Sequence, residues 1–430
     1  MRIWVVVVTM AAFMVAGGFE AWGDKKSERI RVRGSKVLRG SSEKRILAID
    51  QKDLCRPGLT DEELIKTFIR VSEVGGTALC FDLEGFNADG TALDADHVAT
   101  VVRIKDAANA RWMPTVMRVL GSLEDADRKT RLNAVRTAAS AFADNWSILY
   151  WIDGPKSGAL AKAFRKEASK LAVLSSEGGD VDVALDPGHA SRRRPALLIG
   201  RLPADGDTVL HCVLPDDEAS YEALEAYRRL PFELEPWYPS TVGLSKEEVL
   251  DGWVVLFNGR SLDGWAATGW NAEGFIAKDG MIVRDRRGGD SLRTRDRYDN
   301  FALRLEWKID RRGGNSGIFL RAPRENRESK MGFEFQIMGD FGEEAHKNGT
   351  GAVYDVVAPS INASQPAGHW NDLELILNGP RYRAILNGVI IQDLNFDEDE
   401  ELRHRLRNGF IALQDHGSAV AFRNIRIKRL

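Results

Sequence analysis

The hydrophobic pattern of the chain changes near residue 250, and this change constrains the fold more than any other feature. Before it, short apolar runs such as 45–50 (RILAID) and 77–85 (TALCFDLEG) alternate with amphipathic stretches of helical length. After it, the apolar runs are short, alternate with polar residues and are separated by turn signals. Because 430 residues are also too many for one ordinary core, we expect domains of two different classes.

The first part, residues 44–232, is predicted to form an α/β domain with a parallel sheet, because apolar strands separated by amphipathic helices are typical of βαβ units. Several of its strands end in acids: Asp50, Asp82 with Glu84, Asp153, and Asp186. Ligands of α/β sheets bind beyond the carboxyl ends of the strands, so this row could be a site. Aspartate is also a common N-cap and turn residue, and no Gly-rich phosphate loop accompanies the row, so we favour the structural interpretation.

The N-terminal residues resemble an export signal. Arg2 precedes an apolar run of about a dozen residues and then small residues, which suits a signal peptide better than a spanning helix. We expect residues 1–23 to be the signal peptide, cleaved after Gly23, and residues 24–43 to be a basic disordered segment. An uncleaved anchor is the alternative, and both interpretations place the protein outside the cytoplasm, in the periplasm or secreted.

Charge and cysteine content exclude several classes of protein. The formal net charge of −3, from 60 basic and 63 acidic residues, gives no concentrated basic face for nucleic acid. The three cysteines, Cys55, Cys80 and Cys212, are too few for a disulfide scaffold and show no zinc-type spacing. A bond between Cys55 and either of the others stays open at this point.

The second part, residues 252–430, is predicted to be an all-β jelly-roll sandwich. It follows a segment, 233–251, that we interpret as a proline-containing linker and a short helix with Ser245 as N-cap. Asn-Gly pairs such as 258–259, 378–379 and 387–388 lie between short strands, where hairpin turns require positive φ. Many short strands with such turns indicate two antiparallel sheets, one of which can curve into a binding face.

Two predicted strand segments of this part, GNSGIFLR at residues 314–321 and GFEFQI at residues 332–337, carry polar residues that a sheet does not need for stability. In GFEFQI, residues 332–337, Glu334 and Gln336 share one face because side chains alternate along a strand. A solvent-exposed face has the same pattern. The chemical groups of a sugar site are nevertheless all available, and the candidate binding residues are Asn315, Gln336, Tyr354, Gln414, Asp340 and Trp265, beside Arg321, Glu334 and His416. The candidates for an aromatic platform are Trp265, Trp270, Tyr354 and Trp370.

Seven motifs in this part resemble one known family in the same order: VVLFNGRSLDGW, GNSGIFLR, GFEFQI, GAVYD, HWNDLEL, LNG and GFIALQDHGSAVAFRNIRIKRL. They are similar to the 3-keto-disaccharide hydrolase family over residues 252–430 only. The resemblance implies a concanavalin-like jelly roll that acts on 3-keto-glycosides, usually in exported bacterial proteins. One position differs: where the family has Asp after Glu-x-Gln and an aliphatic pair, this chain has Gly339, followed by Asp340.

The implied substrate determines the chemistry that the site must supply. A ketone at C3 acidifies the C2 hydrogen, so a base can form an enolate that expels the group on C1. Our hypothesis assigns Glu334 or His416 as base, and Arg321 with Asn315 or Gln336 as hydrogen-bond donors to the enolate oxygen.

Other interpretations stay open. No cofactor is predicted, but a divalent metal at the groove could replace Arg321, with Glu334, Asp340 and His416 as ligands. A conventional glycosidase would pair Glu334 with Asp340. A non-catalytic carbohydrate-binding module would use the same groove. Because the chain has no dinucleotide-binding motif, a separate oxidoreductase is expected to supply the 3-keto sugar.

Overall fold

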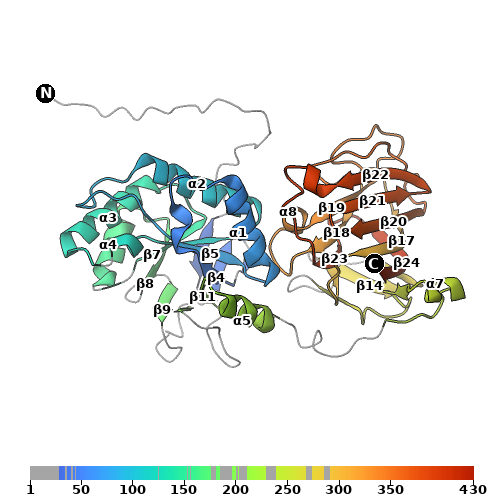
Figure 1. Cartoon of the computed structure of the whole chain (residues 1–430), viewed down its shortest axis with the longest axis horizontal. Helices are drawn as coiled ribbons and strands as arrows, with labels where there is room; N and C mark the ends of the chain where they lie inside the picture. Colours follow the sequence, from blue (N-terminus) through green and yellow to red (C-terminus); the bar gives the residue numbers. More distant parts are fainter. Residues whose placement is uncertain are drawn as a thin grey trace.

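The computed structural model contains two domains that lie side by side, a barrel with surrounding helices and an antiparallel sandwich (Figure 1). The structure describes residues 29–33, 36–39, 42–43, 45–123, 125–152, 154, 156–175, 181–184, 196–199, 202, 211–228, 239–267, 274–284 and 291–430. The predicted signal peptide, Asp153, Asp186, Trp270 and residues 233–238 of the predicted linker segment lie outside these residues. In the part of the chain that the structure describes, no helix has both the length and the apolar character needed to cross a membrane.

In the part of the N-terminal domain that the structure describes, eight parallel strands form one sheet, which confirms the predicted parallel α/β class. The sheet also closes, because the last strand pairs with the first, Cys212 opposite Leu47. The strands are β4 (Leu47–Asp50), β5 (Ala78–Asp82), β6 (Thr115–Arg118), β7 (Ile148–Trp151), β8 (Ala172–Ser175), β9 (Val181–Ala184), β10 (Ala196–Ile199) and β11 (His211–Pro215).

Helices surround this barrel. They are α1 (Asp61–Glu73), α2 (Ala95–Ala110), α3 (Arg128–Ala141), α4 (Ser157–Glu167) and α5 (Glu218–Arg228), with short 3-10 turns η1 (Lys52–Cys55) and η2 (Gly121–Leu123) after β4 and β6. Thr60 and Glu63 form a capping box at the start of α1, while Asp94 and Asp127 cap α2 and α3. These polar caps explain why the helices begin where they do.

Alternation along the strands separates two hydrophobic clusters in the barrel. Leu47, Ile49 and Phe81 pack outward against the helices. Ala48 and Cys80 belong instead to a smaller cluster that fills the barrel interior. All three cysteines are buried and free, so the disulfide alternatives for Cys55 do not occur in this structure.

A small antiparallel sheet precedes the barrel, and it corrects the expectation of disorder for the described residues of segment 24–43, which are 29–33, 36–39 and 42–43. Its strands are β1 (Ile30–Arg33), β2 (Lys36–Arg39) and β3 (Ser42–Glu43). Ile30 and Val37 are buried in the interior cluster of the barrel, and the Ile30 N–H donates to the Trp146 carbonyl at 2.9 Å. The basic composition hid these two apolar anchors, which offset the cost of ordering the segment.

The C-terminal domain consists of two antiparallel sheets, as the jelly-roll prediction required. The larger contains β12 (Val254–Val255), β14 (Phe275–Lys278), β15 (Met281–Arg284), β17 (Phe301–Ile309), β20 (Asn371–Asn378), β21 (Arg381–Leu386), β22 (Val389–Asn395) and β24 (Val420–Arg429). The smaller contains β13 (Trp265–Ala267), β16 (Leu292–Thr294), β18 (Asn315–Ala322), β19 (Phe333–Met338) and β23 (Phe410–Leu413). Outside the sheets lie α7 (Lys246–Leu250), which has the expected Ser245 cap, α8 (Glu328–Met331) and the turn η5 (Phe396–Glu398).

The connection between β18 and β19 contacts the barrel. Figure 1 shows α8, which lies in this connection, on the side of the sandwich next to the barrel. The Asn326 amide donates to the Ser72 hydroxyl and the Gly76 carbonyl, each at 3.1 Å. Met331 and Leu406 pack into the outer hydrophobic cluster of the barrel. Apolar and polar contacts therefore hold the β18–β19 connection against the first domain.

Candidate functional site

One row of side chains crosses the outer face of the five-stranded sheet. Backbone pairing places Arg293 of β16 opposite Ala412 of β23, Ala412 opposite Phe319 of β18, and Phe319 opposite Glu334 of β19. The neighbours of Glu334 on its own strand, Phe333 and Phe335, lie in the core between the sheets. The face that carries Glu334 is thus opposite to the packed interior.

Glu334 has the most unusual environment of the predicted site residues. Its side chain is buried, with 3% of the residue exposed, and its Oε1 atom is buried without a hydrogen-bond partner. Burial raises the pKa of Glu334 to about 8, the charge of Glu328 adds to the rise, and Arg327 and a hydrogen bond with Gln414 oppose it. A carboxyl group with a pKa near neutrality is suited to proton transfer.

Gly317 leaves the space that Glu334 occupies. It lies opposite Gln336 on β19, and its carbonyl accepts the Gln414 N–H at 2.9 Å. A Cβ atom on Gly317 would come within 2.3 Å of Glu334 Oε1. The glycine in GNSGIFLR therefore allows the Glu334 carboxyl to lie over β18, where it meets Gln414.

Two amides extend the polar part of this face. Gln336 is 1% exposed, and its side-chain nitrogen donates to Asn315 Oδ1 at 2.9 Å. This bond leaves the Asn315 amide nitrogen as a donor group. The structure thus brings together Glu334, Gln414, Gln336 and Asn315, four of the residues selected from the sequence.

Arg321 has a different environment from the one expected. It lies at a bulge between the Phe319 and Ala322 pairings, with a positive φ of 49°. Its guanidinium donates to the Asp299 carbonyl at 2.9 and 2.6 Å, and burial lowers its pKa to about 10. The bulge interrupts the alternation of side chains along β18, so Arg321 does not point where the sequence pattern suggested. Its hydrogen bonds to the Asp299 carbonyl instead hold the backbone at the bulge.

Asp340 and Trp265 likewise have structural contacts. The Asp340 carboxylate accepts hydrogen bonds from the Thr350 hydroxyl at 2.6 Å and the Thr350 N–H at 2.8 Å. The Trp265 indole donates to the Leu256 carbonyl at 2.8 Å, and its ring packs in the core between the sheets. The expectation of an aromatic platform at Trp265 is therefore wrong, because the ring faces inward.

Tyr354 and His416 lie near the polar group in the chain but have looser connections to it. The Tyr354 N–H donates to the Glu334 carbonyl at 3.0 Å, and its side chain is half-buried. His416 is exposed two residues after Gln414, in a turn where Asp415 accepts the Gly417 N–H at 2.9 Å. No group of three His, Cys, Asp or Glu side chains converges among the described residues, so the alternative metal trio is not assembled there.

An apolar patch completes the face, and the sequence analysis missed it. Phe319, Ala322, Phe410 and Ala412 form a small buried cluster of their own. The Arg293 guanidinium lies 4.0 Å from the centroid of the Phe410 ring. The sequence could have shown this patch, because side chains alternate along a strand. Ile318 and Leu320 point into the core, so Phe319 between them points to the opposite face. Aromatic rings beside amides and a carboxyl group are typical of sugar sites.

Comparison with known proteins locates the relatives of this second domain. A family model described as a 3-keto-alpha-glucoside-1,2-lyase-like domain matches residues 252–428. A curated 3-keto-disaccharide hydrolase of Bacteroides thetaiotaomicron is 28% identical over 231 residues, which cover 42% of this chain and 79% of that protein.

Solved structures give weaker similarities. One from Parabacteroides distasonis, provisionally described as a glycosyl hydrolase, is 25% identical with a TM-score of 0.39 over 44% of this chain and 98% of its own. A carbohydrate-binding module from Bacillus subtilis is 11% identical with a TM-score of 0.30 over 38% of this chain and 95% of its own. The family model matches where the sequence motifs placed the resemblance, over residues 252–428, so the comparisons confirm that this domain is similar to the 3-keto-alpha-glucoside-1,2-lyase-like domains.

Proposed function

We propose that the C-terminal domain cleaves the glycosidic bond of 3-keto-glycosides and that Glu334 is its base. The observation that supports this assignment is the buried Glu334 carboxyl, with its pKa raised to about 8 and one oxygen without a partner. A buried carboxyl of this kind costs stability, and such groups concentrate at functional sites. The family match and the name of the Bacteroides relative support the substrate class.

The proposed reaction uses the acidity that the C3 ketone gives to C2. The Glu334 carboxylate takes the C2 proton, and the electrons of the C–H bond form an enolate with its charge on the C3 oxygen. The enolate then expels the alcohol from C1, which leaves with a proton and gives a C1–C2 double bond conjugated with the ketone. Water adds at C1 and a proton returns to C2, so the net products are a 3-keto sugar and an alcohol.

Amide groups are the proposed donors to the enolate oxygen. Asn315 and Gln336 lie beside Glu334 and form a hydrogen-bonded pair, which restricts their rotamers before substrate binds. Arg321 leaves the assignment because its guanidinium binds the Asp299 carbonyl. His416, exposed in the neighbouring turn, is the proposed acid for the leaving alcohol.

Conventional hydrolysis of unoxidised glycans is the second candidate function. This mechanism needs a second carboxyl group beside Glu334. Asp340 was the expected partner, but its carboxylate is bound to Thr350. Glu328 takes its place as the candidate, since its charge contributes to the raised pKa of Glu334. A reaction on the unoxidised sugar would distinguish this mechanism from the enolate route.

Mass spectrometry of the products tests the proposal. The purified chain is mixed with a 3-keto-disaccharide and, separately, with its unoxidised parent. We expect cleavage of the keto sugar alone, and we expect Glu334→Gln to lower the rate about a hundredfold or more because the variant lacks the base. Glu374→Gln, which changes a carboxylate on the larger sheet that binds Arg304, is the matched control and should retain activity.

Three outcomes would contradict this assignment. Equal cleavage of both sugars would establish the conventional mechanism. Full activity in Glu334→Gln would exclude this residue as the base. Binding of both sugars without cleavage, if Gly317→Ala abolishes that binding, would mean that the C-terminal domain is a carbohydrate-binding module.

The cellular setting is also part of the proposal. The N-terminal sequence supports export to the periplasm or the medium, as expected from residues 1–23. A separate oxidoreductase would supply the ketone, since the cleavage itself oxidises nothing.

A further inference from the structure

The interior of the barrel changes from apolar to charged at the carboxyl ends of its strands. Asp50, Asp82, Arg118 and Trp151 are the last residues of four successive strands, β4 to β7. Deeper in the barrel, the inward residues are small or apolar, such as Ala48 and Cys80. Active sites of eight-stranded parallel barrels lie at the carboxyl ends of the strands. Polar groups with a purely structural role can lie anywhere in such a barrel, so this position favours a functional role.

The charged groups form one ion-paired cluster. Arg118 donates to both oxygens of Asp50, at 2.7 and 2.8 Å, and its Nε atom donates to Asp82. Asp50 is 9% exposed, and burial raises its pKa above its usual range although Arg118 opposes the rise. Because desolvation offsets the attraction in such a buried cluster, stability alone is a weak explanation for it.

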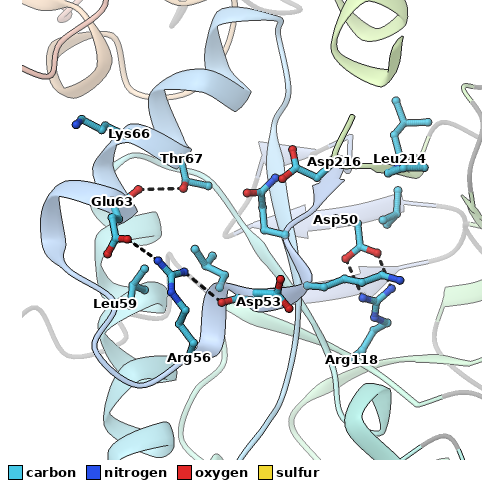
Figure 2. A pocket seen from close by; sticks show the side chains of 15 residues that line it. Asp50, Asp53, Arg56, Leu59, Glu63, Lys66, Thr67, Arg118, Leu214 and Asp216 are labelled. Carbon is cyan, nitrogen blue, oxygen red and sulfur yellow. Dashed lines mark hydrogen bonds and ion pairs between the residues drawn. The ribbon is translucent and has the colours of Figure 1, made fainter. Parts of the chain in front are cut away.

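A large pocket opens onto this cluster. It has a volume of about 830 Å³ and is lined by Asp50 and Arg118, by the turn η1, by one side of α1 and by the end of β11. Figure 2 shows the Asp50–Arg118 pair on one side of the pocket, with Glu63, Lys66 and Thr67 of α1 on the opposite side. A cavity of this size accommodates a small organic ligand.

The charges of the pocket favour a neutral ligand. Four acidic and four basic side chains line it, among them Asp53, Asp216 and Lys52. Arg118 already donates three hydrogen bonds to two carboxylates, so it offers no uncompensated positive charge to a phosphate. Each Asp50 oxygen retains a second lone pair that can accept a hydrogen bond from a hydroxyl group.

Trp151 lies beside this cluster but is not among the residues that line the pocket. It is 7% exposed, and its indole nitrogen is buried without a hydrogen-bond partner. The Arg118 guanidinium lies 5.3 Å from the centroid of its ring. The carboxylates that do line the pocket, Asp50 among them, can accept hydrogen bonds from the hydroxyl groups of a polyhydroxylated molecule.

We propose that the mouth of the barrel is a second carbohydrate-binding site, in which Asp50 accepts hydrogen bonds from the hydroxyl groups of a neutral saccharide. This site lies in the other domain and uses none of the residues around Glu334. It would give the N-terminal domain a binding function of its own.

Calorimetric titration of the full chain with maltose, cellobiose and sucrose tests this proposal. We expect at least one of the three to bind, and Asp50→Asn to weaken that binding about tenfold or more because the variant loses a charged acceptor. Gly317→Ala disturbs the face around Glu334 and serves as the control for the other domain, so it should leave this binding unchanged. Phosphate, titrated in parallel, should not compete.

Hydrogen exchange of the wild-type chain provides a readout that does not depend on whether Asp50→Asn folds. With the bound saccharide, we expect protection of peptides that cover residues 50–56. Failure of all three sugars to bind at millimolar concentration would overturn the proposal. So would binding that Gly317→Ala abolishes, protection confined to residues 315–337, or competition by phosphate.

Discussion

At the scale of single residues, the burial of Glu334 sets stability against its proposed chemistry. Its pKa of about 8 means that the folded chain holds a proton that the unfolded chain releases near pH 4.5. As the pH rises between these values, the unfolded state binds fewer protons than the native state, so the free energy of unfolding falls. The residue therefore destabilises the fold most at the pH where its carboxylate is available.

Replacing Glu334 by Gln should remove this dependence. We expect the two proteins to differ little in stability below pH 4.5 and the variant to be more stable by a few kcal/mol at pH 8 and above, since the amide does not ionise. Denaturant unfolding of both proteins at several pH values measures the difference. A variant that is less stable than the wild type at pH 8 would show that Glu334 is a structural carboxylate.

The fates of individual site residues show what a sequence can reveal at this scale. Glu334 and Gln336 lie on one face because strand parity is local, so it can be read from GFEFQI. Arg321 could not be placed, because a bulge with positive φ interrupts the alternation. Asp340 and Trp265 were misassigned because their partners, Thr350 and Leu256, are distant enough in sequence that only the fold brings them close.

At the scale of elements, β18 and β19 form the candidate site because β18 has a glycine, Gly317, where the Glu334 carboxyl needs space. Gly317 of β18 lies between Gln336 of β19 and Gln414, which follows β23. Because Gly317 has no side chain, the Glu334 carboxyl can lie over β18. Predictions for elements succeeded where the pattern was strong, as with the parallel strands and the antiparallel sandwich. Closure of the barrel could not be predicted, because it depends on the pairing of β11 with β4 across the whole domain.

A methyl group at position 317 should displace the carboxyl group of Glu334, the proposed base. In Gly317→Ala the new Cβ would lie 2.3 Å from Glu334 Oε1, so the carboxyl group must shift from its present position. We expect kcat/KM on a 3-keto-disaccharide to fall about a hundredfold, because displacement of a catalytic group by about 1 Å costs that much. Wild-type kcat/KM in a variant whose thermal midpoint is unchanged would show that the position of Glu334 is not critical.

At the scale of the whole molecule, the barrel contacts the segment that helps to set the charge around Glu334. The Arg327 N–H donates to the Arg111 carbonyl at 3.0 Å, and its side chain donates to the Ala110 carbonyl at 3.4 Å, both at the end of α2. Arg327 is also the cation that lowers the pKa of Glu334 against the effect of burial. The first domain therefore holds an electrostatic partner of the proposed base in place.

The pH dependence of kcat/KM on a 3-keto-disaccharide tests the role of Glu334 most directly. A base must be ionised, so we expect kcat/KM to rise with pH through about 8, and Arg327→Met to shift this rise to higher pH because the variant loses a favourable charge. Glu334→Gln should abolish the rise. A rate that instead falls through pH 8, or that shows the same rise in Glu334→Gln, would contradict the assignment of Glu334 as the base.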